Sequence, residues 1–305
     1  MHEKKFWIEQ EETLAYLRAY PFPIKVLAFD LDGTVLTTEK KVTKETLAVF
    51  QQAADAGIAC IPVTGRPLQG IPEVIRNLPY IPYIITSNGG KIYKMPEAKE
   101  IYADYLPKEK AVAVLHAIAD VPVVPDCFIN GKGNMPTKAF TLVPKMGMSE
   151  AVKVYLLSDT RDFHENIEAF VAATEDGIEK ITINFILEED GSKRFGDLVY
   201  EKLKQIPDLS LVVGAIHNYE VSNLTATKGN ALDWLLKNMK IAPEHAVAFG
   251  DEKNDVTMLE KAGIGVAMGN GVPEAKAVAQ CIADTNDSDG VAKIIKNILA
   301  FRKKI

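Results

Sequence analysis

The chain has 305 residues, with 35 Lys plus Arg against 41 Asp plus Glu and a formal net charge of −6 at pH 7. This length suggests two domains or one domain with a large insertion, and the near-average composition excludes a collagen-like, coiled-coil or disordered chain. The acidic balance gives no basic patch for nucleic acid, and no apolar run is long enough to span a bilayer. We therefore expect no nucleic-acid partner and no membrane association.

The N-terminus lacks a basic segment followed by an apolar one, so it does not look like a secretory signal. The three cysteines, Cys60, Cys127 and Cys281, are far apart in the sequence and form no CxxC pair. Such a pattern is typical of reduced, mostly buried thiols. We expect a cytoplasmic protein whose first 22 residues form a short amphipathic helix outside the main sheet.

After this segment, short apolar strands alternate with amphipathic helices. Residues 24–29 predict a strand buried on both faces, and residues 43–56 predict a helix that a threonine caps and a glycine ends. Residues 58–63 and 83–86 predict two further strands. This alternation of strand and helix predicts a parallel sheet with right-handed crossovers.

The middle of the chain has a different pattern, with longer strands that alternate more between apolar and polar residues. These strands are expected over 181–187, 211–216 and 219–224, with helices near 107–119, 162–175 and 194–205. The pattern predicts an α+β domain with an antiparallel sheet.

The first pattern then returns, with strands expected over 246–249, 263–268 and 280–283 and helices over 231–239, 253–262 and 291–301. We expect residues 1–22 to be an extension, 23–90 and 225–305 to form a core, and 91–224 to form an inserted domain.

Two carboxylates directly follow the first buried strand. Asp30 and Asp32 are two residues apart, so they project to the same side of an extended chain. Ligands collect at the carboxyl ends of the strands in an open parallel sheet, and like charges this close are costly unless a cation or a proton compensates. Capping of a turn is the structural alternative, but the buried strand before the pair and the Gly-Thr turn after it favour a site.

A second group of polar residues follows the second predicted strand. Thr64, Gly65 and Arg66 offer a hydroxyl and a flexible backbone that can give an anion two donors. An ordinary turn between a strand and a helix, with an arginine on the surface, has the same appearance. The group gains weight only from its place at the same end of the sheet as the aspartates.

Two more groups fall at the same predicted edge. Asp251 follows a late strand and stands near Asn254 and Asp255, where capping of the next helix is the alternative. Lys228 lies at the start of a helix, where a cation opposes the helix dipole, so a functional reason for it gains weight. Each group alone is weak evidence, but four groups at one edge predict a functional site.

An edge of this composition suits phosphoryl transfer. Mg²⁺ takes oxygen ligands from one or two carboxylates, from water and from substrate phosphate, and Asp30 and Asp251 can supply the carboxylates. A carboxylate nucleophile can form an aspartyl-phosphate, and a second carboxyl can act as general acid and then general base. Thr64, Gly65 and Lys228 would offset the charge on the transferring phosphoryl group.

Five stretches of the sequence together form a recognisable set of motifs: AFDLDGTVL (28–36), IPVTGR (61–66), SNGG (87–90), TKG (227–229) and AFGDEKNDVTML (248–259). With these motifs the chain resembles the haloacid dehalogenase-like phosphatases and, within them, the Cof-type branch. The resemblance implies a Rossmann-like core, with a parallel sheet flanked by helices, and an inserted α+β cap of type C2.

The resemblance also implies a role for each motif residue. It makes Asp30 the nucleophile and Asp32 the general acid/base. The remaining residues fall into three sets: Mg²⁺ ligands at Asp30, the backbone carbonyl of Asp32, Asp251 and the nearby Asp255; phosphate-binding residues Thr64, Gly65 and Lys228; and substrate-binding residues Arg66, Asn88 and Asn254.

We therefore expect a Mg²⁺-dependent phosphatase of small phosphomonoesters that is a monomer or a homodimer. Sugar phosphates are the default substrates by family habit, and pyridoxal phosphate and flavin mononucleotide stay open. One alternative is a phosphomutase, which would release an isomerised sugar phosphate in place of inorganic phosphate. The other is a catalytically silent protein that binds phosphorylated metabolites, which total inactivity toward a broad phosphate panel with Mg²⁺ would favour.

Overall fold

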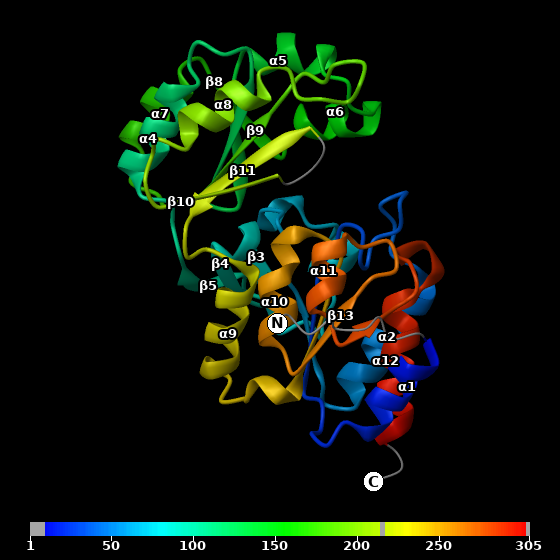
Figure 1. Cartoon of the computed structure of the whole chain (residues 1–305). Helices are drawn as coiled ribbons and strands as arrows, with labels where there is room; N and C mark the ends of the chain where they lie inside the picture. The colour runs from blue at the N-terminus through cyan, green and yellow to red at the C-terminus, as the bar shows by residue number, and fades with distance from the viewer. Residues whose placement is uncertain (1–9, 214–216, 303–305) are drawn as a thin grey trace. The chain divides into compact units, whose positions relative to one another are not determined.

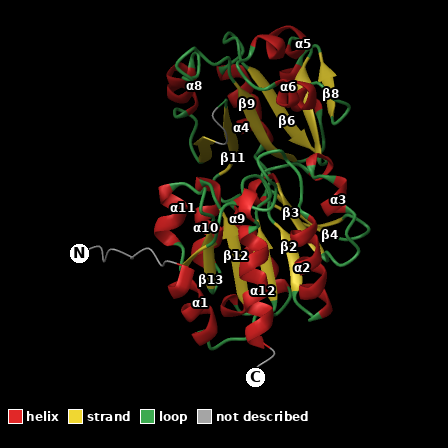
Figure 2. Ribbon diagram, turned by 90° about the vertical axis from the view of Figure 1, so that its right-hand side faces the viewer, coloured by secondary structure: helices red, strands yellow, loops and turns green. Residues whose placement is uncertain are grey.

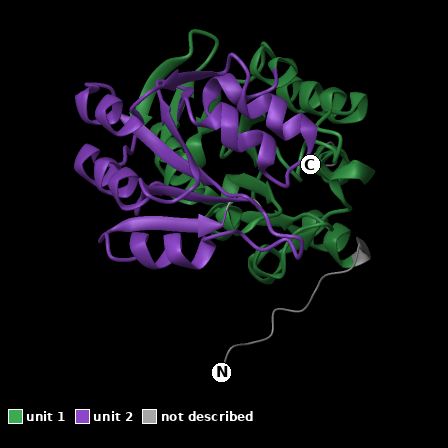
Figure 3. Ribbon diagram, turned by 90° about the horizontal axis from the view of Figure 1, so that it is seen from above, with its two compact units in different colours: residues 1–65, 73–102, 227–305 green, residues 66–72, 103–226 purple. Residues whose placement is uncertain are grey.

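The structure is a computed structural model that describes residues 10–213 and 217–302. The chain forms two compact units (Figure 3), which we call the core unit and the cap unit. The core unit comprises residues 1–65, 73–102 and 227–305, and the cap unit comprises residues 66–72 and 103–226. Residues 91–102, which the sequence analysis grouped with the inserted domain, lie in the core unit, and residues 66–72 lie in the cap unit.

A five-stranded parallel sheet, in the order β14-β13-β12-β1-β2, forms the centre of the core unit. In the register, Val26 pairs with Ala246 on one side and with Ala59 on the other. The next strand along the chain, β2, lies on one side of β1, and the later strands β12 to β14 lie on the other side. This change of direction creates a topological switch point beside β1. The strands are β1 (Val26–Phe29), β2 (Ala59–Pro62), β12 (Ala246–Gly250), β13 (Ile264–Ala267) and β14 (Cys281–Ile282).

Helices cover both faces of this sheet (Figures 1 and 2), because successive strand side chains point to opposite faces. Val26 and Ala28 pack with α9, α10 and α11, whereas Phe29 stacks on Phe50 of α2, with ring centroids 4.4 Å apart. Helix α12 lies against α2, and α1 lies against α12. The core helices are α1 (Gln10–Ala19), α2 (Lys44–Asp55), α3 (Glu73–Arg76), α9 (Lys228–Asn238), α10 (Val256–Lys261), α11 (Pro273–Val278) and α12 (Gly290–Arg302).

The expected third strand is present, but it joins the parallel sheet only at the end of β2. Strand β3 (Tyr83–Thr86) pairs antiparallel with β4 (Lys91–Lys94), in a small sheet that β5 (Lys99–Ala103) completes. A single parallel bridge, between Val63 and Ile85, joins this sheet to the end of β2. The prediction of a strand at 83–86 beside the second strand is therefore correct, and this strand also has a hairpin partner, β4, that the sequence did not reveal.

The cap unit contains a six-stranded sheet in the order β10-β11-β9-β6-β7-β8, which is antiparallel except between β7 and β8. Helices α4, α7 and α8 pack on one face of this sheet. Its strands are β6 (Val124–Ile129), β7 (Lys132–Pro136), β8 (Arg161–His164), β9 (Ile178–Asn184), β10 (Leu209–Val213) and β11 (Asn218–Asn223). Its helices are α4 (Lys108–Ala117), α5 (Ala139–Leu142), α6 (Glu150–Leu156), α7 (Ile167–Ala173) and α8 (Gly196–Leu203).

The fold class predicted from the sequence is confirmed, but one element is wrong. The helix expected over 162–175 begins only at Ile167, because Asn166 caps it by accepting the Ala169 N–H. The residues before it form β8, which joins the sheet as a parallel edge strand beside β7. Of the strand expected over 211–216, the part up to Val213 lies in β10, and residues 214–216 lie outside the described residues.

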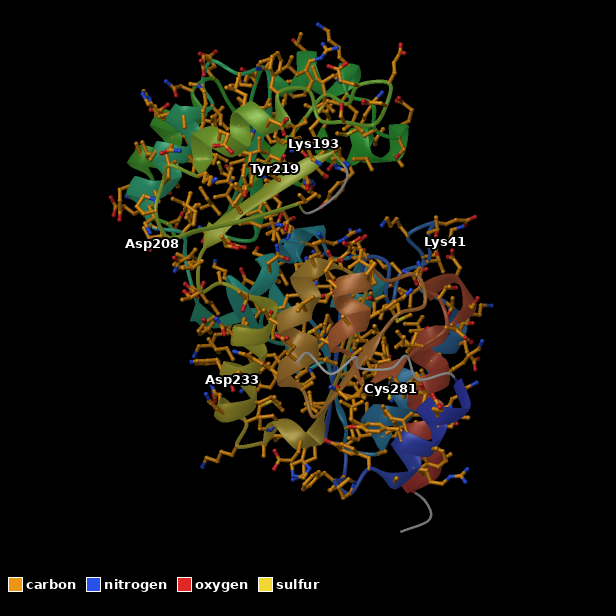
Figure 4. The ribbon with its side chains drawn as sticks, in the orientation of Figure 1. Lys41, Lys193, Asp208, Tyr219, Asp233 and Cys281 are labelled. Carbon is orange, nitrogen blue, oxygen red and sulfur yellow. The ribbon has the colours of Figure 1, made fainter. Side chains whose placement is uncertain are left out.

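Side chains of both units are drawn in Figure 4. Cys281, labelled there, is buried in the core unit, and Cys60 and Cys127 are also free and buried, as the sequence predicted. In the cap unit, Lys193 Nζ lies 5.2 Å from the centroid of the Tyr219 ring. Within the described part of the chain, no helix is both long and apolar enough to cross a membrane.

Candidate active site

Three neighbouring strands of the core sheet end in polar residues at the same edge. Asp30 follows β1, Asp251 follows β12, and Thr64 lies two residues after β2. The strands are parallel and β1 lies between the other two, so their carboxyl ends lie side by side. The N–H of Asp30 donates to the carbonyl of Phe249 at 3.0 Å, which extends the ladder between β1 and β12 up to the site.

Lys228 is buried between two carboxylates. Its Nζ donates to Asp30 Oδ1 at 2.7 Å and to Asp255 Oδ1 at 2.6 Å, and only 1% of its side chain is exposed. It is the first residue of α9, which Thr227 caps by accepting the Asn230 N–H. Lys228 therefore stands at the start of a helix, as the sequence predicts, and the capped first turn fixes the backbone of the lysine.

Asp255 holds the loop after β12 in place. Its Oδ2 accepts the N–H groups of Asp251 and Glu252, at 2.9 and 3.0 Å, while its Oδ1 accepts from Lys228. Asp255 is fully buried. Both of its oxygens therefore have partners within the core unit, and one side chain connects the lysine to the backbone that presents Asp251.

Asp251 is positioned by the loop after β1. The hydroxyl of Thr34 donates to Asp251 Oδ1 at 2.8 Å. Gly33, just before it, has φ = +82°, a conformation that favours glycine, and a Cβ built there would overlap Asp251 Oδ2. A glycine at this position is thus needed both for the turn and for space beside the carboxylate.

The charges of this cluster do not balance, because three buried aspartates share one lysine. Burial, together with the charges of Asp255, Asp251 and Asp32, raises the pKa of Asp30 well above its usual value, although Lys228 opposes the shift. Burial and the charge of Asp255 raise the pKa of Asp251 to about 7. Burial alone would lower the pKa of Lys228, but Asp255 and Asp30 outweigh it and raise that pKa.

The same carboxylates fit a divalent cation. Asp30, Asp251 and Asp255 each offer an oxygen within 4.8 Å of the others. Oxygen donors of this kind, with room for water and phosphate oxygens, are the ligands that Mg²⁺ prefers. Without a cation, burial favours the protonated form of these carboxyls. A cation beside them would offset their negative charge and so favour the ionised form.

Asp32 lies apart from this acidic group. Its Oδ1 pairs with Lys40 Nζ at 2.8 Å, and 37% of its side chain is exposed. It is nevertheless close enough for its charge to raise the pKa of Asp30. The two aspartates of the first motif thus differ in environment, one buried against a lysine and one at the surface.

The remaining predicted residues of the core unit form a second small group. Thr64 is buried, and its carbonyl accepts the N–H of Asn88 at 3.1 Å. Asn254 Nδ2 donates to Asn88 Oδ1 at 3.1 Å, while the buried Asn254 Oδ1 has no hydrogen-bond partner in the described part of the chain. Gly65 is the last residue of the core unit before the chain enters the cap unit.

Arg66 belongs to the cap unit. Its Nη1 donates to the carbonyl of Gly70 at 2.8 Å, and its guanidinium lies 5.9 Å from the ring of Tyr155 in α6. The three consecutive residues of the second motif are therefore divided between the two units, with Thr64 and Gly65 in one and Arg66 in the other.

Comparison with known proteins agrees with this geometry. The family model of the haloacid dehalogenase-like hydrolases matches residues 27–295. The chain belongs to this family. The resemblance predicted from the motifs is thus confirmed, and the match begins and ends within the core unit.

Three similar proteins illustrate the haloacid dehalogenase-like family. Phosphatase YwpJ of Bacillus subtilis (strain 168) is 29% identical over 90% of this chain and 100% of its own length. The 5-amino-6-(5-phospho-D-ribitylamino)uracil phosphatase YcsE of the same organism is 29% identical, over 90% of this chain and 95% of its own. The solved structure of a haloacid dehalogenase-like hydrolase from B. subtilis, 27% identical, has a TM-score of 0.75 and covers 90% of this chain and 99% of its own. The protein is therefore an enzyme, a phosphatase of this family.

Sequence reasoning missed two residues that support this phosphatase site. Thr34 stands inside the first motif, but only the structure shows that its hydroxyl holds Asp251. Thr257 Oγ1 accepts the N–H of Gly229 at 3.1 Å, which ties the first turn of α9, next to Lys228, to α10. Neither contact has a local sequence signal, because each joins segments that are distant along the chain.

Proposed function

We propose that the protein hydrolyses small phosphomonoesters in a Mg²⁺-dependent reaction that passes through a phosphoryl group bound covalently to Asp30. The observation that carries the proposal is the buried ion pair between Lys228 and Asp30 at the carboxyl end of β1, with Asp251 in the same acidic group. A cation, a carboxylate nucleophile and an ammonium together are the parts that phosphoryl transfer needs.

In this proposal Asp30 attacks phosphorus through the carboxylate oxygen that Lys228 leaves unoccupied. Its ion pair with Lys228 keeps it oriented and favours the charged form that attacks. Lys228 and the Thr64–Gly65 turn offset the negative charge of the phosphoryl group. Asp32, nearer the surface than Asp30, gives a proton to the leaving alcohol and later takes one from the attacking water.

Mg²⁺ would be held by Asp30 and Asp251, and it would supply positive charge against the phosphoryl oxygens. Asp255 acts with them mainly by orientation, since its two oxygens already accept from Lys228 and from two backbone N–H groups. Arg66, Asn88 and Asn254 are the proposed contacts to the rest of the substrate.

The test is a phosphate-release screen over a panel of phosphorylated metabolites with Mg²⁺. Asp30→Asn keeps the shape of the side chain and is expected to abolish turnover, while the circular dichroism spectrum stays that of the parent. Near-parental phosphate release by Asp30→Asn would contradict the role of the nucleophile. Isomerised sugar phosphate in place of inorganic phosphate would identify a mutase.

The substrate is proposed by chemistry, as a sugar phosphate or a similar small phosphomonoester. One relative is named for a substrate with a phosphorylated ribityl chain, which supports testing phosphorylated polyols first. Cytoplasmic location and a monomeric or homodimeric state stay predictions from the sequence.

A further inference from the structure

The segment between β13 and α11, both labelled in Figure 1, contacts the backbone of Asp251. The N–H of Val272 donates to the Asp251 carbonyl at 2.8 Å. A Cβ built on Gly271 would lie 3.1 Å from the same carbonyl oxygen and 3.2 Å from Asp251 Cα, so the two backbones approach closely. This segment therefore supports the main chain from which the Asp251 carboxylate projects.

Asn270, in the same segment, connects it to the loop after β1. Its Nδ2 donates to the carbonyl of Gly33 at 2.8 Å, and its Oδ1 accepts the N–H of Asn286 at 2.9 Å. A carbonyl can only accept and a backbone N–H can only donate, so these two partners fix which way the amide faces. Asn270 thus holds the peptide group between Gly33 and Thr34 in one orientation.

A second asparagine holds the far end of that loop. Asn286 is 8% exposed, and its Nδ2 donates to the carbonyl of Leu36 at 2.9 Å. Within the loop, the N–H groups of residues 34–36 all donate to the carbonyl of Leu31. The loop is therefore closed by its own hydrogen bonds, and asparagines from outside it hold it at Gly33 and at Leu36.

These contacts complete a ring of hydrogen bonds around Asp251. The Asp251 carbonyl accepts from Val272, which lies two residues after Asn270. Asn270 donates to Gly33, and the hydroxyl of the next residue, Thr34, donates to Asp251 Oδ1. The ring fixes both the main chain and the carboxylate of Asp251. Residues that orient a metal ligand without binding the ion tune the affinity for the metal.

We propose that Asn270 is a positioning residue for the divalent cation. It sets the affinity of the acidic group for Mg²⁺ by holding the loop where the Thr34 hydroxyl fixes Asp251. Both polar atoms of the Asn270 side chain have protein partners, so it acts through the loop rather than as a ligand. The inference rests on the proposed function in one respect, namely that this acidic group holds Mg²⁺.

The test is calorimetric titration of the full-length protein with MgCl₂ at pH 8, without substrate. Asn270→Leu keeps the approximate size of the side chain and removes both hydrogen bonds of the amide. We expect the Kd for Mg²⁺ to rise about three- to tenfold, the effect of one lost hydrogen bond. Asn270→Ala, which adds no apolar surface, should behave in the same way. Because Asn270 is exposed, the Tm of both variants in EDTA should stay within about 4 °C of the parent.

A matched control exists in α12 of the same unit. Asn297 Nδ2 also donates to a backbone carbonyl, that of Lys293, at 2.9 Å. Asn297→Leu therefore removes the same kind of hydrogen bond away from the loop after β1, and we expect it to leave the Kd for Mg²⁺ unchanged. A parental Kd in both Asn270→Leu and Asn270→Ala overturns the inference, and so does an equal rise of the Kd in Asn297→Leu.

A double-mutant cycle tests whether Asn270 acts through Thr34. Thr34→Val removes the hydroxyl that holds Asp251 Oδ1, and it should itself raise the Kd for Mg²⁺. In the Thr34→Val background, Asn270→Leu should raise the Kd less than about twofold further, because the contact that it positions is already lost. A role in general stability predicts instead that the two effects multiply in full, and that result overturns the inference.

Phosphate release distinguishes failure of this inference from failure of the proposed function. In Asn270→Leu, the Mg²⁺ concentration for half-maximal rate should rise with the Kd, while kcat at saturating Mg²⁺ stays within about twofold of the parent. A parent that binds Mg²⁺ but releases no phosphate from any substrate contradicts the proposed function, and the titrations still decide the role of Asn270. A parent that binds no Mg²⁺ contradicts both.

Discussion

The raised pKa of Asp251 predicts that the affinity of the core unit for Mg²⁺ increases with pH. Without a cation, burial and the charge of Asp255 raise that pKa to about 7. A carboxyl must lose its proton before it can bind a metal ion, so proton and metal compete for the same oxygen atoms. Lowering the pH from 8 to 6 is the perturbation, and it is expected to weaken Mg²⁺ binding.

The expected size follows from the fraction of Asp251 that is ionised. With a pKa of about 7, roughly one eleventh of the carboxyl is ionised at pH 6 and roughly ten elevenths at pH 8. The apparent Kd for Mg²⁺ should therefore fall about tenfold between these two values. The pKa of Asp30 is raised as well, so its titration can only steepen the dependence.

Isothermal titration calorimetry in the absence of substrate measures both consequences. Titrations at pH 6, 7 and 8 give the Kd, and repeating each in buffers of different ionisation enthalpy counts the protons released. We expect Asp251 to release nearly one proton per ion at pH 6 and almost none at pH 8, and any proton that Asp30 releases adds to this number. Asp251→Asn is the control. Its Kd for Mg²⁺ should be weaker than that of the parent, and this Kd should change less with pH, because the titrating carboxyl is absent.

A Kd that stays within twofold from pH 6 to pH 8, with no proton release, would refute the reasoning. It would mean that Asp251 is ionised throughout the range, or that the ion binds elsewhere. The two explanations separate in Asp251→Asn, since only the first predicts a large loss of affinity in the variant at every pH.

Three substitutions test the contacts that shape the site. Lys228→Met leaves buried carboxylates without their positively charged partner, so we expect the free energy of unfolding at pH 8 to fall by about 3–5 kcal/mol, as measured by urea denaturation with EDTA. This loss should be smaller toward pH 5, because carboxyls with raised pKa values take up protons there. Gly33→Ala should reduce turnover and Mg²⁺ affinity, because the added Cβ displaces Asp251. The positive φ alone should cost roughly 1–2 kcal/mol of stability. Gly57→Ala, in a similar turn remote from the site, should show this stability cost without the loss of turnover and Mg²⁺ affinity. Thr257→Val removes the acceptor of the Gly229 N–H and should lower kcat while KM stays unchanged, whereas Thr257→Ser should retain kcat; equal kcat in the two variants would exclude the positioning role.

The strand ends of the site could be predicted from the sequence, because their cause is local. Each of Asp30, Thr64 and Asp251 follows a run of apolar residues, and parallel strands bring their carboxyl ends to one edge. The contacts between side chains could not be predicted in the same way. Lys228 and Asp255 are 27 residues apart, and their ion pair depends on how the first turns of α9 and the loop after β12 pack.

The errors have physical reasons of the same kind. Strand β8 was expected to be helical, and its state is decided by pairing with β7, which provides backbone partners that no local pattern reveals. Residues 66–72 were expected in the core, but they lie in the cap unit, where the N–H of Gln69 donates to the carbonyl of Gly131. In both cases long-range backbone hydrogen bonds outweigh what neighbouring residues suggest.

The charge distribution also indicates which carboxylates most need a cation. Lys228 contacts Asp30 and Asp255, whereas Asp251 has only the Thr34 hydroxyl as a side-chain partner and forms no ion pair with any described residue. Asp255 has its charge met by the lysine and by two backbone N–H groups. The uncompensated negative charge is therefore concentrated on the side of Asp251 and of the second oxygen of Asp30. We infer that Asp30 and Asp251 are the principal Mg²⁺ ligands and that Asp255 contributes by orienting Lys228 and the loop. Asp255→Asn should therefore lower the free energy of unfolding more than Asp251→Asn does, and it should weaken Mg²⁺ binding less.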